Sequence, residues 1–165
     1  MRCVARGAPD AVVLGQPVYD ASVPSSRLVG RYATHVWVWI ETLSFDIRDS
    51  MCGFRVYPLD AACGLIDTVA LPTRMDFDIE ILVRLHWRGL RFIGLPTRVV
   101  YAVGGLSHFD VLWDNVRISR SHARLAFGML LRAPMLLGRK LVRASRAVRG
   151  AAQPASAGEP REDAR

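Results

Sequence analysis

Three short polar blocks interrupt an otherwise apolar, arginine-rich sequence, and they contain the residues whose types and spacing could do chemistry. They are residues 49–55, 76–80 and 104–108. Each block places carboxylates, basic groups or glycines where the chain is expected to turn into or out of a strand or helix, which is where α/β enzymes keep their sites. The search for function therefore starts at these three turns.

The first block combines a carboxylate with a glycine and a guanidinium. Asp49 comes just before a predicted strand that contains Gly53 and Arg55. Asp49 could orient a sugar hydroxyl or pair with a basic group, and Gly53 would let a ligand approach the backbone. The alternative is a structural turn, in which Asp49 accepts hydrogen bonds from the following backbone and Arg55 lies on a solvated face. The residue types alone leave both interpretations open.

The second block contains three acids. Two carboxylates two residues apart, as in Asp76 and Asp78, can hold Mg²⁺ or Mn²⁺. These acids open a predicted helix, however, where carboxylates are favoured by the helix dipole and where side chains at i and i+2 diverge. We therefore predict no metal site here. Asp76, Glu80 and Arg84 share one helix face, so Glu80 could act as a general base or hydroxyl ligand, or could pair with Arg84.

The third block offers groups that suit a phosphate. Gly104 and Gly105 expose backbone amides, and Ser107 and His108 add a hydroxyl and an imidazole. Such a set can hold phosphate or pyrophosphate. Glycine pairs are common in loops, and a surface histidine is the simpler interpretation of His108. The other three histidines lack metal-ligand spacing, so no zinc site is predicted.

Strands and helices alternate along the sequence that positions these blocks. Apolar runs bounded by turn residues predict strands, and apolar residues at spacings of three and four predict helices. Thr73 followed by Asp76 is typical of a capping box, Gly89 is placed to end that helix, and Pro96 suggests a bend or a sheet edge. The expected elements are strands over residues 11–19, 52–57 and 90–101, and helices over 27–45, 58–71, 73–88 and 115–147, the last broken near Pro134.

The composition predicts one globular domain followed by a helical segment and a tail. The sequence has 165 residues, of which 51% are hydrophobic, so it can bury one sizeable core. Alternating strands and helices indicate the α/β class. We divide the chain into an α/β domain over residues 1–110, a basic amphipathic helical segment over 111–150, and a tail over 151–165 that we expect to be disordered.

The net charge of +7 comes from one segment. Residues 1–110 carry eleven arginines against eleven acids, whereas residues 111–150 carry nine basic side chains and a single acid, Asp114. This segment has few aromatic side chains to stack on bases, so we predict no nucleic-acid partner. An anionic membrane surface fits better. Residues 125–138 are too short to span a bilayer and contain Arg132 and Pro134, so the chain would lie on the membrane without crossing it.

The cysteines and the basic composition suggest a compartment. Cys3, Cys52 and Cys63 are odd in number and form no C-x-x-C pair, which predicts neither a zinc site nor a disulfide framework. The predominance of arginine, with Lys140 as the single lysine, suggests a GC-rich bacterial genome. We expect a cytoplasmic protein that lies peripherally on the inner face of the bacterial cell membrane.

In their order, the blocks resemble the C-terminal half of a family-2 glycosyltransferase with the GT-A fold, the group that includes dolichyl- and polyprenyl-phosphate sugar transferases. That family has an Asp-x-x-x-Gly-Phe-Arg strand, a helix opened by Phe and Glu-Ile, a Leu-Pro or Val-Pro strand, and a Gly-x-Ser loop. The matching segments are residues 49–55, 77–81, 95–96 and 105–108. His108 stands where the family usually has lysine. The resemblance covers roughly residues 9–140 and implies a partial GT-A-like sheet with flanking helices.

The resemblance also implies a reaction and its residues. An acceptor oxygen would attack the anomeric carbon of a nucleotide-activated sugar; a carboxylate would deprotonate a hydroxyl acceptor, whereas a lipid phosphate would need no base. By position, the catalytic carboxylates would be Asp49 and Glu80, and the substrate-binding residues would be Arg27, Arg31, Gly53, Arg55, Asp76, Gly105, Ser107 and His108.

The family's donor-binding half, with the Asp-x-Asp pair that holds Mg²⁺ or Mn²⁺, would precede the residues seen here. The chain is therefore expected to hold no cofactor itself and to be inactive without that half. Its expected partners are the nucleotide sugar, a lipid or glycan acceptor, and the membrane. The alternative is a non-catalytic membrane-surface or partner-binding module derived from such an enzyme.

Overall fold

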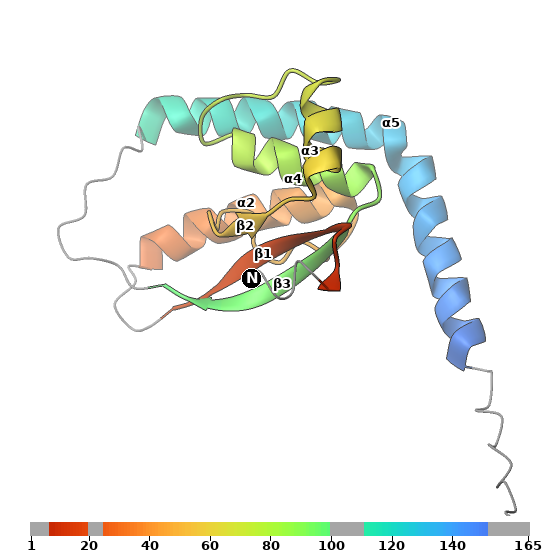
Figure 1. The fold of residues 1–165 in the computed structure, drawn as a ribbon. Coiled ribbons are helices and arrows are strands. Elements are labelled where there is room, and N and C mark those ends of the chain that lie inside the picture. The colour runs from red at the N-terminus through yellow and green to blue at the C-terminus, as the bar shows by residue number, and fades with distance from the viewer. Residues whose placement is uncertain (1–6, 20–24, 100–110, 152–165) are drawn as a thin grey trace, which may run out of the picture.

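The protein has a mixed α/β fold in which helices pack on a small sheet (Figure 1). The computed structural model describes residues 7–19, 25–99 and 111–151. In that part of the chain there are three strands and four helices. In chain order they are β1 (Ala11–Val18), α2 (Ser25–Thr42), β2 (Arg55–Val56), α3 (Leu59–Ile66), α4 (Phe77–Trp87), β3 (Arg91–Arg98) and α5 (Val111–Ala151).

The sheet has the order β2-β1-β3, with the apolar strand β1 at its centre. Strand β1 runs parallel to β3, with Val18 opposite Arg98, so both strands end at the same edge of the sheet. It runs antiparallel to β2, with Val13 opposite Val56. Val12 and Val13 are fully buried, as expected for a continuous apolar run in a central strand. The predicted strand over residues 11–19 is thus confirmed.

The two outer strands differ from their predicted lengths. Strand β3 begins one residue after the predicted start and lies at the described edge of the sheet, which is where Pro96 can be accommodated without a missing ladder hydrogen bond. Residues 100 and 101 of that prediction lie outside the described residues. Strand β2 covers only two of the six predicted residues, and it follows a turn in which the carbonyls of Ser50 and Cys52 accept hydrogen bonds from the Arg55 side chain.

Helices α2, α4 and α5 lie together on one side of the sheet (Figure 1). Helix α4 is at the centre of the core, with eight of its eleven residues buried. The Trp87 indole N–H donates to the Glu41 carbonyl of α2 at 2.8 Å, and the Trp87 ring packs on α5 at Gly128. A Cβ at Gly128 would lie 2.8 Å from Cη2 of Trp87, so the close approach of α4 and α5 requires glycine there.

The ends of the helices follow local chemistry that was only partly predicted. Helix α2 stops three residues before the predicted Phe45, because Leu43 adopts a left-handed conformation with φ of 49°. The predicted capping box at Thr73 is wrong: α4 starts after Asp76, and that residue makes no side-chain cap to the helix. Asp76 instead accepts a hydrogen bond from the Ser121 hydroxyl at 3.4 Å. Gly89 ends α4 with φ of 91°, as predicted.

Helix α5 is continuous through Pro134, so the predicted break is wrong. Figure 1 shows that the helix bends instead, with its first part against α2 and α4 and its last part projecting from the body. Proline removes one helical hydrogen bond, and a bend without termination is one outcome of that loss. The first part joins the core through Leu125, which is fully buried, and through His122, whose Nδ1 lies 2.7 Å from Oε1 of Glu41. Within the described ranges, no helix combines the length and apolar character needed to cross a bilayer.

Candidate site at the carboxyl ends of the parallel strands

The turn over residues 49–53 is built around the Asp49 side chain. Its Oδ1 accepts hydrogen bonds from the backbone N–H groups of Met51 at 2.9 Å and Cys52 at 2.7 Å. This is the structural turn expected of an aspartate in this position. The carboxylate is buried, and its turn leads directly into β2. Asp49 therefore has a structural role, whatever else it does.

Two predicted site residues, Arg31 and Asp49, pair with each other. Nε and Nη2 of Arg31 donate to the Asp49 carboxylate at 2.9 and 2.7 Å, which is the two-pronged geometry typical of arginine and carboxylate. His35, one turn further along α2, places Nε2 3.4 Å from Oδ2 of Asp49 and Nδ1 3.0 Å from the Ser50 hydroxyl. Burial alone would raise the pKa of Asp49, but the hydrogen bonds from His35 and Arg31 outweigh it and hold the pKa below its usual value.

The expectation that Arg55 lies on a solvated face in a structural turn is wrong. Only 3% of its side chain is exposed. Its guanidinium donates to the carbonyls of Cys52 at 2.6 Å and Ser50 at 2.8 Å, and to Oδ1 of Asp78 at 2.9 Å. Arg55 therefore ties the turn to the first turn of α4. Gly53, by contrast, is exposed, and a Cβ there would meet no atom within 4 Å.

Two adjoining hollows open beside this turn. One encloses about 470 Å³ and the other about 360 Å³, and they share Tyr19 and Arg31. Both lie where β1 and β3 end, which is where open α/β sheets bind ligands. The Arg31 guanidinium lies 5.5 Å from the centre of the Tyr19 ring. The first hollow is lined by Tyr19, Val29, Arg31, Tyr32, His35 and Asp49, and the second by Pro17, Tyr19, Arg31, residues 51–54 and Val99.

Glu80, the second predicted carboxylate, lines neither hollow. It is fully buried, and its Oε2 accepts from Nε of Arg84 at 2.8 Å, the pairing that the helix spacing allowed. Its Oε1 accepts from Nε of Arg124, on α5, at 2.9 Å. Both oxygens are thus occupied by guanidinium groups, and the structure does not bring Glu80 and Asp49 into one cavity.

Of the remaining predicted site residues, Asp76 lies away from the two hollows, and the side chains of the others lie outside the described part of the structure. Asp76 lies in a different cleft, between the α3–α4 connection and α5. Arg27 belongs to α2, but its side chain lies outside the described part of the structure. The entire third block, with Gly105, Ser107 and His108, also lies outside the described residues.

The cleft that contains Asp76 was not predicted. It encloses about 450 Å³ and is lined by four arginines. Three of them, Arg117, Arg120 and Arg124, recur at spacings of three and four in the sequence, which places them on one helix face. That spacing could have predicted a basic helix face. It could not have predicted the opposite wall of the cleft, because Arg74 on that wall is more than forty residues away in the sequence.

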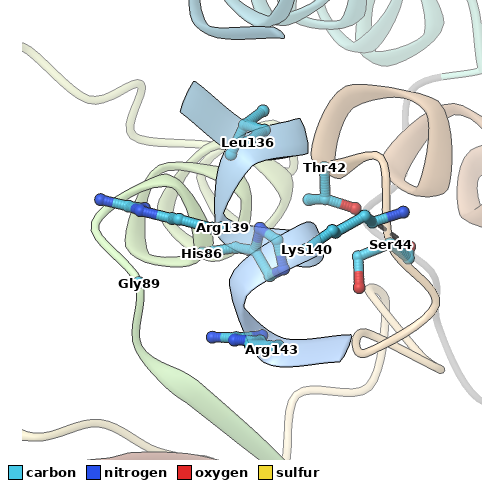
Figure 2. A pocket seen from close by; sticks show the side chains of 8 residues that line it. All are labelled: Thr42, Ser44, His86, Gly89, Leu136, Arg139, Lys140 and Arg143. Carbon is cyan, nitrogen blue, oxygen red and sulfur yellow. Dashed lines mark hydrogen bonds between the residues drawn. The ribbon is translucent and has the colours of Figure 1, made fainter. Parts of the chain in front are cut away.

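A third hollow is basic but too small to hold more than a water molecule. Figure 2 shows His86, Arg139, Lys140 and Arg143 around it, together with Thr42 and Ser44. Its volume is about 30 Å³. The His86 Nε2 lies 3.4 Å from Oδ2 of Asp46, and burial, which outweighs that interaction, lowers the pKa of His86.

Comparison with protein-family models, with curated proteins and with solved structures yields no match for this chain. Within the described ranges, no group of three or more histidine, cysteine, aspartate or glutamate side chains is placed to hold a metal ion. The interpretation of the site therefore depends on its own geometry and on the order of motifs in the sequence.

Proposed function

We propose that this chain forms the acceptor side of a GT-A-type, family-2 glycosyltransferase that transfers a sugar from a nucleotide donor to a membrane-associated acceptor. The observation that carries the proposal is the Asp49 turn beside two hollows at the carboxyl ends of β1 and β3. The order of the motifs around that turn is the second support. Donor binding, with Mg²⁺ or Mn²⁺, would be supplied by an Asp-x-Asp half that pairs with this one.

The state of Asp49 favours one class of acceptor. A carboxylate whose pKa is lowered and whose oxygens already accept hydrogen bonds is a weak general base. A hydroxyl acceptor would need such a base, whereas a phosphate acceptor brings an oxygen that is already anionic. We therefore propose a lipid phosphate as the acceptor. Asp49 would then act by holding Arg31 toward the phosphate.

The walls of the first hollow fit such a ligand. Val29 and Tyr32 expose large apolar surfaces at its mouth, suited to the hydrocarbon next to a lipid phosphate. The Arg31 guanidinium uses Nε and Nη2 for Asp49, and its Nη1 makes no hydrogen bond to another described side chain. That nitrogen is available for a phosphate oxygen. His35 lies one helical turn away on the same wall.

Binding of a polyprenyl phosphate in neutral phospholipid nanodiscs tests the proposal. Tyr32→Ser changes an exposed wall residue and leaves the Asp49 turn intact, so it should weaken binding several-fold. The unfolding midpoint should fall only slightly, because the substitution also removes an edge contact with the Trp39 ring. Arg31→Gln should weaken it further. Arg91→Gln removes an exposed arginine at the start of β3 and should bind like the original chain. Equal binding by all four proteins would contradict the proposed acceptor site.

A transfer assay tests the assignment of the donor half. The chain is incubated with a nucleotide sugar, Mn²⁺ and polyprenyl phosphate, and sugar transfer to the lipid is followed. We expect no turnover from this chain alone. Sustained transfer would show that the donor half is not required, and would contradict that part of the proposal.

The outer part of α5 favours a second candidate, a module that lies on an anionic membrane. Beyond Pro134, Leu137, Leu141 and Val142 are exposed, and they alternate with the basic Arg139, Lys140 and Arg143. Exposed apolar side chains between basic ones are typical of an interfacial helix. The bacterial inner membrane, seen from the cytoplasm, would supply the anionic surface.

Flotation with anionic vesicles separates this candidate from the first. Leu141→Ser should reduce the floated fraction, whereas Ala144→Ser makes a polar change at an exposed position in the same part of α5 and should not. Loss of flotation with retained binding to polyprenyl phosphate would assign membrane attachment to α5 and show that acceptor recognition does not depend on it. Unchanged flotation in Leu141→Ser would contradict the role of α5.

A further inference from the structure

The four-arginine cleft has two walls that face each other. One wall is the connection between α3 and α4, residues 70–76, which contributes Arg74; the other is α5, which contributes Arg117, Arg120 and Arg124. Figure 1 shows this connection beside the first part of α5. The cleft is open and encloses about 450 Å³. The cleft therefore has basic side chains on both walls. A row of arginines on the surface of a single helix would present them on one side only.

The carboxylates near the cleft do not neutralise its arginines. Three carboxylates lie in or beside the cleft: Asp76, Asp114 and Glu80. They face five guanidinium groups, which are those of the four cleft arginines and that of Arg84, which also pairs with Glu80. Two positive charges therefore remain. Arg120 makes no hydrogen bond or ion pair with the described part of the chain.

Two of the ion pairs beside the cleft are long, and three of its arginines are about half exposed. Arg74 and Arg117 each lie 3.5 Å from the same Oδ1 of Asp114, beyond good hydrogen-bond distance for a charged pair. The side chains of Arg74, Arg117 and Arg124 are 53%, 44% and 49% exposed. Their guanidinium groups thus keep N–H donors in reach of a ligand. Ser121 adds a hydroxyl at the base of the cleft.

We propose that this cleft binds a phosphate group, either free or carried on a lipid. A phosphate dianion matches the two unneutralised charges, and its oxygens accept paired N–H donors from arginine on both walls. The cavity is much larger than the small basic hollow of Figure 2, which has room for about one water molecule. Leu112 and Val116, on the same part of α5, are exposed apolar residues that a lipid could contact. This site is independent of the Asp49 hollows and of the function proposed for them.

Titration of the full chain with inorganic phosphate tests the proposal. Arg74→Gln and Arg120→Gln remove one arginine from each wall, and each should weaken phosphate binding about tenfold, the effect of losing one charge-assisted hydrogen bond. Arg91→Gln and Arg48→Gln are the controls, because both arginines are exposed and neither lines the cleft or belongs to the outer part of α5. Both controls should bind within about twofold of the original chain.

The source of the phosphate is decided by a second arm with vesicles. Phosphatidylcholine vesicles with and without phosphatidic acid are floated with the same proteins, in the presence and absence of inorganic phosphate. Displacement by inorganic phosphate indicates a site that takes the free ion, and retention indicates a lipid headgroup. Because Arg120 makes no hydrogen bond or ion pair with the described residues, its variant should keep the original unfolding midpoint. Equal weakening by the cleft variants and their controls, or no binding of either probe, would overturn the proposal.

Discussion

Arginines carry out opposite tasks in two regions of this molecule. In the Asp49 turn, Arg31 and Arg55 have side chains that are 17% and 3% exposed, and their donors are used by carboxylates and backbone carbonyls. In the cleft between α3–α4 and α5, Arg74, Arg117 and Arg124 are about half exposed and share too few carboxylates. The difference lies in the number of acceptors around each guanidinium. The first region uses most of its donors for structure and leaves Nη1 of Arg31 for a ligand, whereas the second leaves several guanidinium groups available.

The largest expected effect is the loss of the buried arginine in the turn. Arg55→Met leaves the carbonyls of Ser50 and Cys52 without their donor, which should cost about 3 kcal/mol of unfolding free energy, since each unsatisfied buried group costs about 1–3 kcal/mol. Urea unfolding measures the change. The same substitution at the exposed Arg91 is the control. If both variants unfold at the same midpoint, Arg55 does not hold the turn.

Asp49→Asn should have the next largest effect and a specific pH dependence. The amide keeps an acceptor for the turn but loses the charge that pairs with Arg31, so we expect a loss of about 2 kcal/mol at neutral pH. The pKa of Asp49 is lowered on folding, so its contribution is complete above the unfolded value of 3.8 and is lost as the pH falls through the folded value. Unfolding at pH 7 and pH 3 should therefore show a difference between the proteins that shrinks on acidification. A constant difference would argue against the ion pair.

Arg124 lies at the boundary between the two kinds of environment. Its partner Glu80 is buried, but Arg84 also pairs with Glu80, and half of the Arg124 side chain is exposed. Arg124→Gln should therefore cost about 1 kcal/mol, as for a partly exposed ion pair. Thermal unfolding gives the value. A cost as large as that of Arg55→Met would mean that the arginines of the cleft are structural as well.

The smallest expected effect is at Arg120. Without phosphate, Arg120→Gln should change the unfolding free energy by no more than about 0.5 kcal/mol, as for a surface substitution that removes no hydrogen bond or ion pair to the described residues. In saturating phosphate, the original chain should gain stability that the variant does not. Parallel thermal scans with and without phosphate measure both quantities. A destabilised variant in the absence of phosphate would show that Arg120 has a structural partner.

Local patterns predicted the elements better than their ends. The apolar run from residue 11 predicted the central strand, and Gly89 predicted the end of α4. Pro96 suggested a bend or a sheet edge, and β3 lies at the edge of the described sheet. The end of α2 at Leu43 and the continuity of α5 through Pro134 were missed. Leu43 ends α2 in a left-handed conformation that leucine rarely adopts, and α5 continues through Pro134 with a bend (Figure 1).

The sequence alone determined the alternation of strands and helices, the Asp49 turn and the concentration of positive charge in the last helix, because each of these follows from residues close together in the chain. Only the tertiary structure decided which charges are neutralised. Asp49 and Arg31 are eighteen residues apart, and Glu80 and Arg124 are forty-four apart. Whether an arginine finds enough acceptors depends on where distant elements place them, and that placement is set by packing of the shared core around α4.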